Sequence, residues 1–104
     1  MLDLFSKTPD HYMSFKGLAS GAPAVILADS GATGNFVDSS YARHYGFARH
    51  PSKQKILGIN TMSKSVSKCY IKVKMQSHIS NVECQVVDMQ QQYDVILGQD
   101  WFLK

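Results

Sequence analysis

The residue best placed for chemistry is Asp29, because it directly follows the short apolar run 24–28 and precedes a loop of small residues, 30–35. A carboxylate at the end of a buried strand is costly unless backbone amides solvate it, and small residues let those amides approach. Such a carboxylate can act as a general acid or a general base. The residues alone also allow a simpler interpretation, in which Asp29 only accepts hydrogen bonds within a turn.

The cysteines and histidines do not indicate a metal site. Cys69 and Cys84 are the only two thiols, too few for a disulfide scaffold, and neither has a histidine at metal-ligand spacing. The histidines occur singly, and none belongs to a His-Glu-x-x-His motif. We therefore expect reduced, buried thiols and no metal site.

Two segments carry motifs that resemble those of known enzymes. Residues 26–33, Ile-Leu-Ala-Asp-Ser-Gly-Ala-Thr, resemble the apolar-apolar-x-Asp-Ser/Thr-Gly-Ala-Ser/Thr signature of retroviral-type aspartic proteases. Residues 93–102, Tyr-Asp-Val-Ile-Leu-Gly-Gln-Asp-Trp-Phe, resemble the Asp-Val-Ile-Leu-Gly-x-Asp-Trp-Leu stretch in proteases of Gypsy-type long-terminal-repeat retrotransposons. Asp-Ser-Gly alone is a weak signal, but the pair of motifs is specific, and the resemblance extends over residues 12–102.

The resemblance implies a mostly-β chain that folds as a retropepsin-like closed β-barrel of six to seven strands, one lobe per chain, with one or two short helices. It also implies a homodimer, because hydrolysis of a peptide by paired carboxylates needs two of them and this chain offers one candidate, Asp29. The two Asp29 carboxylates would share one proton, so that one activates water and the other donates to the scissile carbonyl. This chemistry requires neither a metal nor a cofactor.

The resemblance assigns further roles by position. Ser30 is expected to hydrogen-bond across the two-fold axis, and Gly31 to let the substrate backbone approach. Ala32 and Thr33 are expected to line the floor of the cleft. The resemblance also implies a flap, a hairpin whose tip closes over the substrate. Substrate binding is thus assigned to two loop residues, to the tip of this flap and to one pocket residue: Gly31, Thr33, Asn60, Thr61, Met62 and Ile96.

The resemblance also bears on the last strand and on the tip of the flap. Gly98 is expected to permit close packing of the last strand on the active-site loop. For Ile96 and Leu97 a role in the core remains an alternative to a role in a substrate pocket. Relatives commonly carry Gly after Asn or Asp at the flap tip, whereas Thr61 follows Asn60 here, so the turn type stays open.

The elements that must position these residues are mainly strands. We expect a flexible leader over residues 1–10 and the protease domain over 11–104. Apolar patterns predict strands at 11–16, 24–28, 53–59, 66–75, 79–88 and 93–98, with the polar stretch 60–65 as the tip of a long hairpin. Asp38 or Ser39 is expected to cap one short helix that ends near Gly46, and a second helix is expected to start within 99–103.

Length and composition fit one such domain, since the chain has 104 residues of which 44% are hydrophobic. No apolar run approaches the roughly 18 residues that span a bilayer, and no signal peptide is evident. We therefore expect no membrane partner, and either a cytoplasmic location or one inside virus-like particles.

The net charge of +3 is unevenly distributed, because no acidic residue lies between Asp38 and Glu83. Lys72 and Lys74 alternate with apolar residues, as on a strand that faces water. No stacking-aromatic motif accompanies the charge, so we do not expect nucleic-acid binding.

Three functional interpretations follow. The first is a homodimeric aspartic endopeptidase that cleaves a retroelement polyprotein. The second is a domesticated or inactive retropepsin-like domain that binds peptides or mediates dimerisation, and the third is an unrelated β-barrel that binds nucleic acid. The intact Asp29, Ser30 and Gly31 favour the first.

Overall fold

The structure is a computed structural model that describes residues 2–3, 12–52, 55–57, 62–64, 67–89 and 92–102. In these residues, strands dominate and the helices are short. The elements in chain order are β1 (Leu2–Asp3), β2 (Tyr12–Ala19), β3 (Ala22–Asp29), β4 (Phe36–Asp38), α1 (Ser39–His44), β5 (His50–Pro51), β6 (Lys55–Leu57), β7 (Met62–Lys64), β8 (Ser67–Met75), β9 (His78–Val87), β10 (Val95–Leu97) and α2 (Gln99–Phe102).

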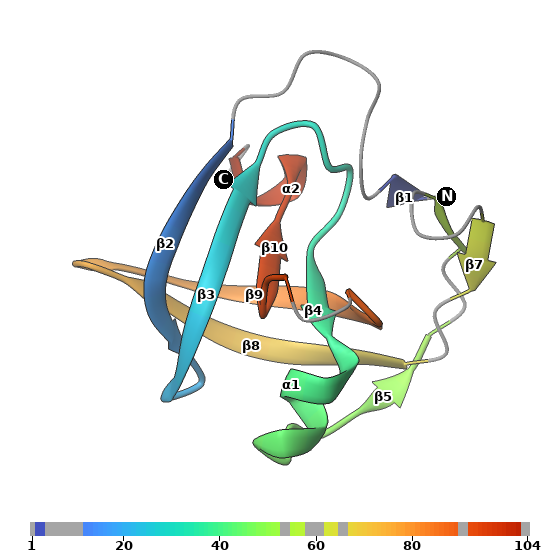
Figure 1. The fold of residues 1–104 in the computed structure, drawn as a ribbon, viewed down its shortest axis with the longest axis horizontal. Helices are drawn as coiled ribbons and strands as arrows, with labels where there is room; N and C mark the ends of the chain where they lie inside the picture. The colour runs from blue at the N-terminus through green and yellow to red at the C-terminus, as the bar shows by residue number, and fades with distance from the viewer. Residues whose placement is uncertain are drawn as a thin grey trace.

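The main sheet closes on itself to form a barrel (Figure 1). Its strand order is β2-β3-β10-β4-β9-β8-β5, and an additional pairing joins β2 to β8. This pairing sets Leu18 opposite Lys74 and Ala19 opposite Val73, so six strands form a closed ring and β5 extends the sheet beyond β8. The expected mostly-β closed barrel with short helices is confirmed.

The short strand β10, which carries the second motif, lies between β3 and β4 in the barrel sheet and so brings the two sequence motifs together. It runs parallel to β3, with Ile96 beside Leu27, and antiparallel to β4, with Ile96 beside Phe36. Since alternate side chains of a strand point to opposite faces, Ile26 and Leu97 enter the main core while Leu27 and Ile96 enter a second, smaller core. Both faces of β3 are therefore buried where it meets β10.

The β2–β3 hairpin has a two-residue turn. Only Ser20 and Gly21 form the turn, both with positive φ, and Pro23 already lies in β3 opposite Leu18. A two-residue turn with two positive φ values matches the twist of the flanking strands. The first half of β3 has one open face, because Val25 is 36% exposed, whereas its second half is buried on both faces.

The helix α1 forms where the capping residues predicted it. The Tyr41 backbone N–H donates to Asp38 Oδ2 at 3.1 Å, which makes Asp38 the N-cap. The chain leaves the helix through Gly46, whose φ of +67° is the left-handed conformation that favours glycine. The Tyr41 hydroxyl donates to the Pro23 carbonyl oxygen at 2.9 Å, so α1 packs against the start of β3.

The remaining strands form a separate small sheet, visible beside the barrel in Figure 1. In it β6 pairs antiparallel with β7, with Leu57 opposite Met62, and β1 pairs parallel with β6. The sequence predicted one long hairpin in which the strand at 53–59 pairs with the strand at 66–75. Instead, β6 pairs with β7 at 62–64, and β8 pairs with β9, β2 and β5.

Two predicted regions are only partly covered. Of the expected flap tip, Asn60 and Thr61 lie outside the described residues, and Met62 is described only through its backbone in β7. Of the predicted leader, Leu2 and Asp3 form β1, and its flexibility stays a prediction. No helix in the described part of the chain is long and apolar enough to cross a membrane.

Candidate active site

Asp29 is the last residue of β3, and its carboxylate is buried at 2% exposure. The Gly31 backbone N–H donates to Asp29 Oδ1 at 2.9 Å, and the Ala32 N–H donates to the Asp29 carbonyl oxygen at 3.1 Å. The small residues after β3 thus bring their amides to the aspartate, as the sequence predicts. The Gly31 N–H bonds to the carboxylate itself, whereas the Ala32 N–H closes a backbone turn around it.

Hydrogen bonds hold the loop after Asp29 against the junction of β10 and α2. The Gly98 N–H donates to Asn35 Oδ1 at 2.9 Å, and the Gln99 N–H donates to the Ala32 carbonyl oxygen at 2.7 Å. On its other side, the Asn35 carbonyl oxygen accepts from the Gln85 N–H of β9 at 2.9 Å. The loop that follows the catalytic candidate is therefore fixed to two strands of the barrel.

Glycine is required at position 98 by this close packing. A Cβ atom there would lie 2.1 Å from the Gly34 carbonyl oxygen and 2.5 Å from the Ala32 carbonyl oxygen. Both obstacles are backbone atoms of the loop, so neither can rotate away. The expectation that Gly98 permits close packing on the active-site loop is confirmed.

Sequence reasoning missed the role of Asn35. The side chain and the carbonyl oxygen of this buried residue connect the loop to β10 and to β9. The available signal was an amide side chain directly before the apolar strand at 36–37, where a polar residue needs a partner.

The four loop residues predicted from the resemblance occupy different environments. Gly31 and Ala32 are buried, while Ser30 and Thr33 are partly exposed. Ala32 packs into the smaller core with Leu27, so within one chain it does not line an open floor. The roles of Ser30 across a two-fold axis and of Gly31 and Thr33 toward a substrate stay predictions.

Ile96 is 1% exposed and packs in the smaller core, whose buried members are Leu27, Ala32, Phe36, Val87, Met89 and Ile96. Leu97 is also buried, in the main core. Within the single chain both residues therefore have the core role that the sequence left open. The assignment of Ile96 to substrate binding stays a prediction.

Other buried or half-buried aspartates have structural roles. Asp38 caps α1, and its second oxygen accepts from the Met89 N–H at 2.9 Å. Asp94 Oδ2 accepts from the Val25 N–H at 2.7 Å, which ties the start of β10 to β3. Of the carboxylates whose side chains the structure describes, Asp29 is the one that precedes the small-residue loop 30–35.

The thiols are placed in the main core of the barrel. Cys69 of β8 and Cys84 of β9 lie opposite each other, and both are buried and reduced. Burial raises the pKa of the Cys69 thiol, which disfavours the nucleophilic thiolate. In the described ranges, no group of three or more His, Cys, Asp or Glu side chains is placed to hold a metal ion.

Comparisons with known proteins agree with this arrangement. The family model for the PEG10/RTL1 protease domain matches residues 25–104, which include both motifs. Among solved structures, the chain is similar to that of EIAV protease complexed with the inhibitor HBY-793, with a TM-score of 0.72 at 16% sequence identity. The similarity covers 89% of this chain and 86% of the EIAV protease chain. A comparison with curated protein sequences gave no match.

The structural similarity establishes the fold, and the family match includes the loop and the strand that the fold brings together. Asp29 at the end of β3 and Gly98, which directly follows β10 and packs on the loop after Asp29, both fall within the matched residues. The chain therefore belongs to the PEG10/RTL1 protease domain family, a group of retropepsin-like domains of the aspartic-protease type related to Gypsy-type retrotransposons.

Proposed function

We propose that the protein is a homodimeric aspartic endopeptidase that cleaves peptide bonds in a retroelement polyprotein. The observation that carries this proposal is the placement of Asp29. Its carboxylate is buried at the end of β3, held by the Gly31 N–H, in a loop fixed to β10 by Asn35 and by the close approach of Gly98. A catalytic group needs this kind of rigid support to act in one geometry.

The requirement for a dimer follows from the chemistry. Among the residues described, Asp38 and Asp94 are engaged in structural contacts, so one lobe supplies Asp29 alone as a candidate. Hydrolysis of a peptide by carboxylates uses one group as base and another as acid. The second group in this proposal is Asp29 of a second copy.

The proposed reaction needs no covalent intermediate. The two Asp29 carboxylates share one proton, because two negative charges about 3 Å apart are strongly disfavoured. The ionised carboxylate takes a proton from water as the water oxygen attacks the scissile carbonyl carbon. The protonated carboxyl donates to the carbonyl oxygen, and the tetrahedral intermediate collapses when a proton passes to the leaving nitrogen.

The substrate in this proposal is an extended polypeptide. Gly31 and Thr33 of the loop would contact its backbone, and the β6–β7 hairpin with the predicted tip Asn60, Thr61 and Met62 would close over it. Closure would exclude water from the carboxylate pair. Ser30 would align the two loops by a hydrogen bond between the copies.

The test is cleavage of an unfolded protein substrate at acidic to neutral pH by wild type and by Asp29→Asn. Asparagine keeps the shape and an acceptor for the Gly31 N–H, but it cannot accept the proton of water. The matched control is Asp88→Asn, an exposed aspartate just after β9. We expect Asp29→Asn to abolish pepstatin-sensitive cleavage and Asp88→Asn to retain it.

Two outcomes contradict the proposal. Cleavage that survives in purified Asp29→Asn removes this residue from the catalytic role. A wild-type protein that dimerises and binds peptides but cuts none supports the domesticated, inactive alternative.

A further inference from the structure

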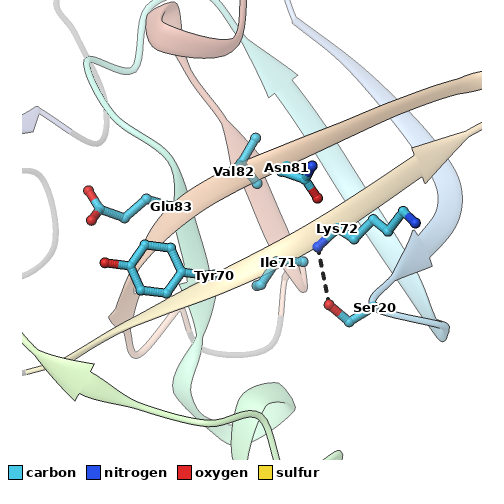
Figure 2. Close-up of a pocket in the computed structure, with 7 residues that line it drawn as sticks. All are labelled: Ser20, Tyr70, Ile71, Lys72, Asn81, Val82 and Glu83. Carbon is cyan, nitrogen blue, oxygen red and sulfur yellow. Dashed lines mark hydrogen bonds between the residues drawn. The ribbon is translucent and has the colours of Figure 1, made fainter.

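The outer face of β8 carries a basic strip outside the proposed active site. Alternation along this strand buries Cys69, Ile71 and Val73 and turns the residues between them to solvent. We call the outward-facing residues of β8 with their exposed neighbours on β9 the outer β8 face, which consists of Lys68, Tyr70, Lys72, Lys74, Ile79, Asn81 and Glu83. Figure 2 shows Tyr70, Lys72, Asn81 and Glu83 around a shallow groove on this face.

The charge of this face is positive. Glu83 is its one acidic residue, and its Oε1 lies 2.8 Å from Lys68 Nζ, so this pair is close to neutral. Lys72 and Lys74 are both exposed and two residues apart on the same strand. The strand rise places their Cα atoms about 7 Å apart, in a row that faces one way.

An exposed aromatic ring stands in the same row. Tyr70 is 60% exposed. Because β5 pairs with β8, the ring of His50 meets the Tyr70 ring edge-to-face with centroids 5.1 Å apart. Lys68 Nζ lies 5.7 Å from the centroid of the Tyr70 ring. The neighbours restrict the ring, so a stacked partner would cost little additional side-chain entropy.

The contact between Tyr70 and His50 is an aromatic feature that the sequence pattern does not reveal. The sequence-based expectation against nucleic-acid binding depended on the lack of an aromatic motif beside the lysines, and it stays untested. The fold supplies the aromatic site from two segments, since Tyr70 and His50 are twenty residues apart and meet only through the pairing of β5 with β8.

We propose that the outer β8 face binds single-stranded nucleic acid. Lys72 and Lys74 contact backbone phosphates, Tyr70 stacks on a base, and the Asn81 amide, which lies opposite Lys72 in the β8–β9 pairing, hydrogen-bonds to a base edge. A positive groove with a stacking aromatic is the usual arrangement for such binding. An acidic peptide would use the lysines but would gain no stacking on Tyr70, so the ring favours nucleic acid.

The test is the fluorescence anisotropy of a labelled oligouridylate of about 12 nucleotides, titrated with the protein at several salt concentrations. Tyr70→Leu is expected to weaken binding about fivefold or more, because one stacked base is lost. Lys72→Gln combined with Lys74→Gln is expected to reduce the slope of log affinity against log salt by about 1.4, since each phosphate contact on a single strand contributes about 0.7.

Matched controls use the same residue types elsewhere on the surface. Tyr45→Leu and Arg43→Gln alter an exposed tyrosine and an exposed cation of α1 and its C-cap, and neither should change the affinity. Thermal melting confirms that each variant is folded. Tyr70, Lys72 and Lys74 are exposed, so we expect all three substitutions to leave the fold intact. If Tyr70→Leu is nevertheless unstable, the salt dependence of binding by the double lysine variant tests the proposal.

Three results would overturn the proposal. One is the absence of salt-dependent binding of the oligonucleotide to wild type. Another is an affinity that Tyr70→Leu and the double lysine variant leave unchanged. The last is equal binding of a polyglutamate peptide together with insensitivity to Tyr70→Leu, which would assign the face to an acidic protein partner.

Discussion

Replacing Gly98 with alanine tests whether the loop after β3 depends on its close contact with β10. The new Cβ would lie 2.1 Å from the Gly34 carbonyl oxygen, whereas real Cβ atoms essentially never approach closer than 3.0 Å, so the backbone must shift by about 0.9 Å. This shift breaks two hydrogen bonds, from the Gly98 N–H to Asn35 and from the Gln99 N–H to Ala32. Overpacking costs about 1–3 kcal/mol, and two lost hydrogen bonds add about 1 kcal/mol each.

We therefore expect Gly98→Ala to lower the free energy of unfolding by about 3–5 kcal/mol, with the midpoint of thermal unfolding at least about 12 °C lower. A displacement near 1 Å at a catalytic group can reduce the rate about 100-fold, so activity of the folded fraction should fall as well. Circular dichroism melting and peptide cleavage measure the two effects separately.

The control is Gly21→Ala in the β2–β3 turn. A Cβ at that position meets nothing within 4 Å, but its φ of +88° is strained for alanine. We expect a loss of only about 1–2 kcal/mol there and no change in the rate per folded molecule. The reasoning is refuted if Gly98→Ala melts no lower than Gly21→Ala and cleaves peptide at the wild-type rate.

The remaining predictions concern the loop, the dimer and a buried thiol. Asn35→Ala leaves the Gly98 N–H without its acceptor, so chemical denaturation should show a free energy of unfolding that is about 1–3 kcal/mol lower. An unchanged free energy of unfolding would show that this hydrogen bond does not stabilise the fold. Ser30→Ala should weaken the dimer in sedimentation equilibrium by about 1 kcal/mol for each of the two symmetric hydroxyls, and an unchanged constant would make Ser30 an ordinary turn residue. Burial raises the pKa of the Cys69 thiol above 9.0, so the unfolded chain loses this proton first, and the stability present below pH 9.0 is lost as the pH rises toward the folded pKa. Cys69→Ala should lack this alkaline decline in urea unfolding measured against pH, and an identical decline in both proteins would contradict the assignment.

Local features of the fold could be predicted from the sequence because each depends on neighbouring residues. Asp38 and Gly46 marked the two ends of α1, and the apolar run before Asp29 marked the end of β3. The small residues after Asp29 indicated an amide-solvated carboxylate, which the Gly31 contact confirms. For Gly98 the local sequence gave no steric reason, and the expectation of close packing came from the family resemblance.

Features that depend on pairing between distant segments could not be predicted. Nothing in the local pattern shows that β10 inserts between β3 and β4, or that Asn35 would meet Gly98. Gln85 occupies an outward position in the alternation of β9, yet it is buried because β4 pairs with this part of β9 and Ser52 donates to its side chain. The contact between His50 and Tyr70 likewise follows from a two-residue strand that the apolar pattern does not reveal.

The central claim is that two copies of Asp29 form one active site, and subunit mixing tests it most directly. Wild-type protein is held at a fixed concentration above its dimerisation constant and equilibrated with a threefold excess of Asp29→Asn. If both carboxylates are required, mixed dimers are inactive, and random association reduces peptide cleavage to about one quarter of the value without the variant. Cleavage that stays unchanged at that excess would show that a single Asp29 suffices, and the shared-site account would be wrong.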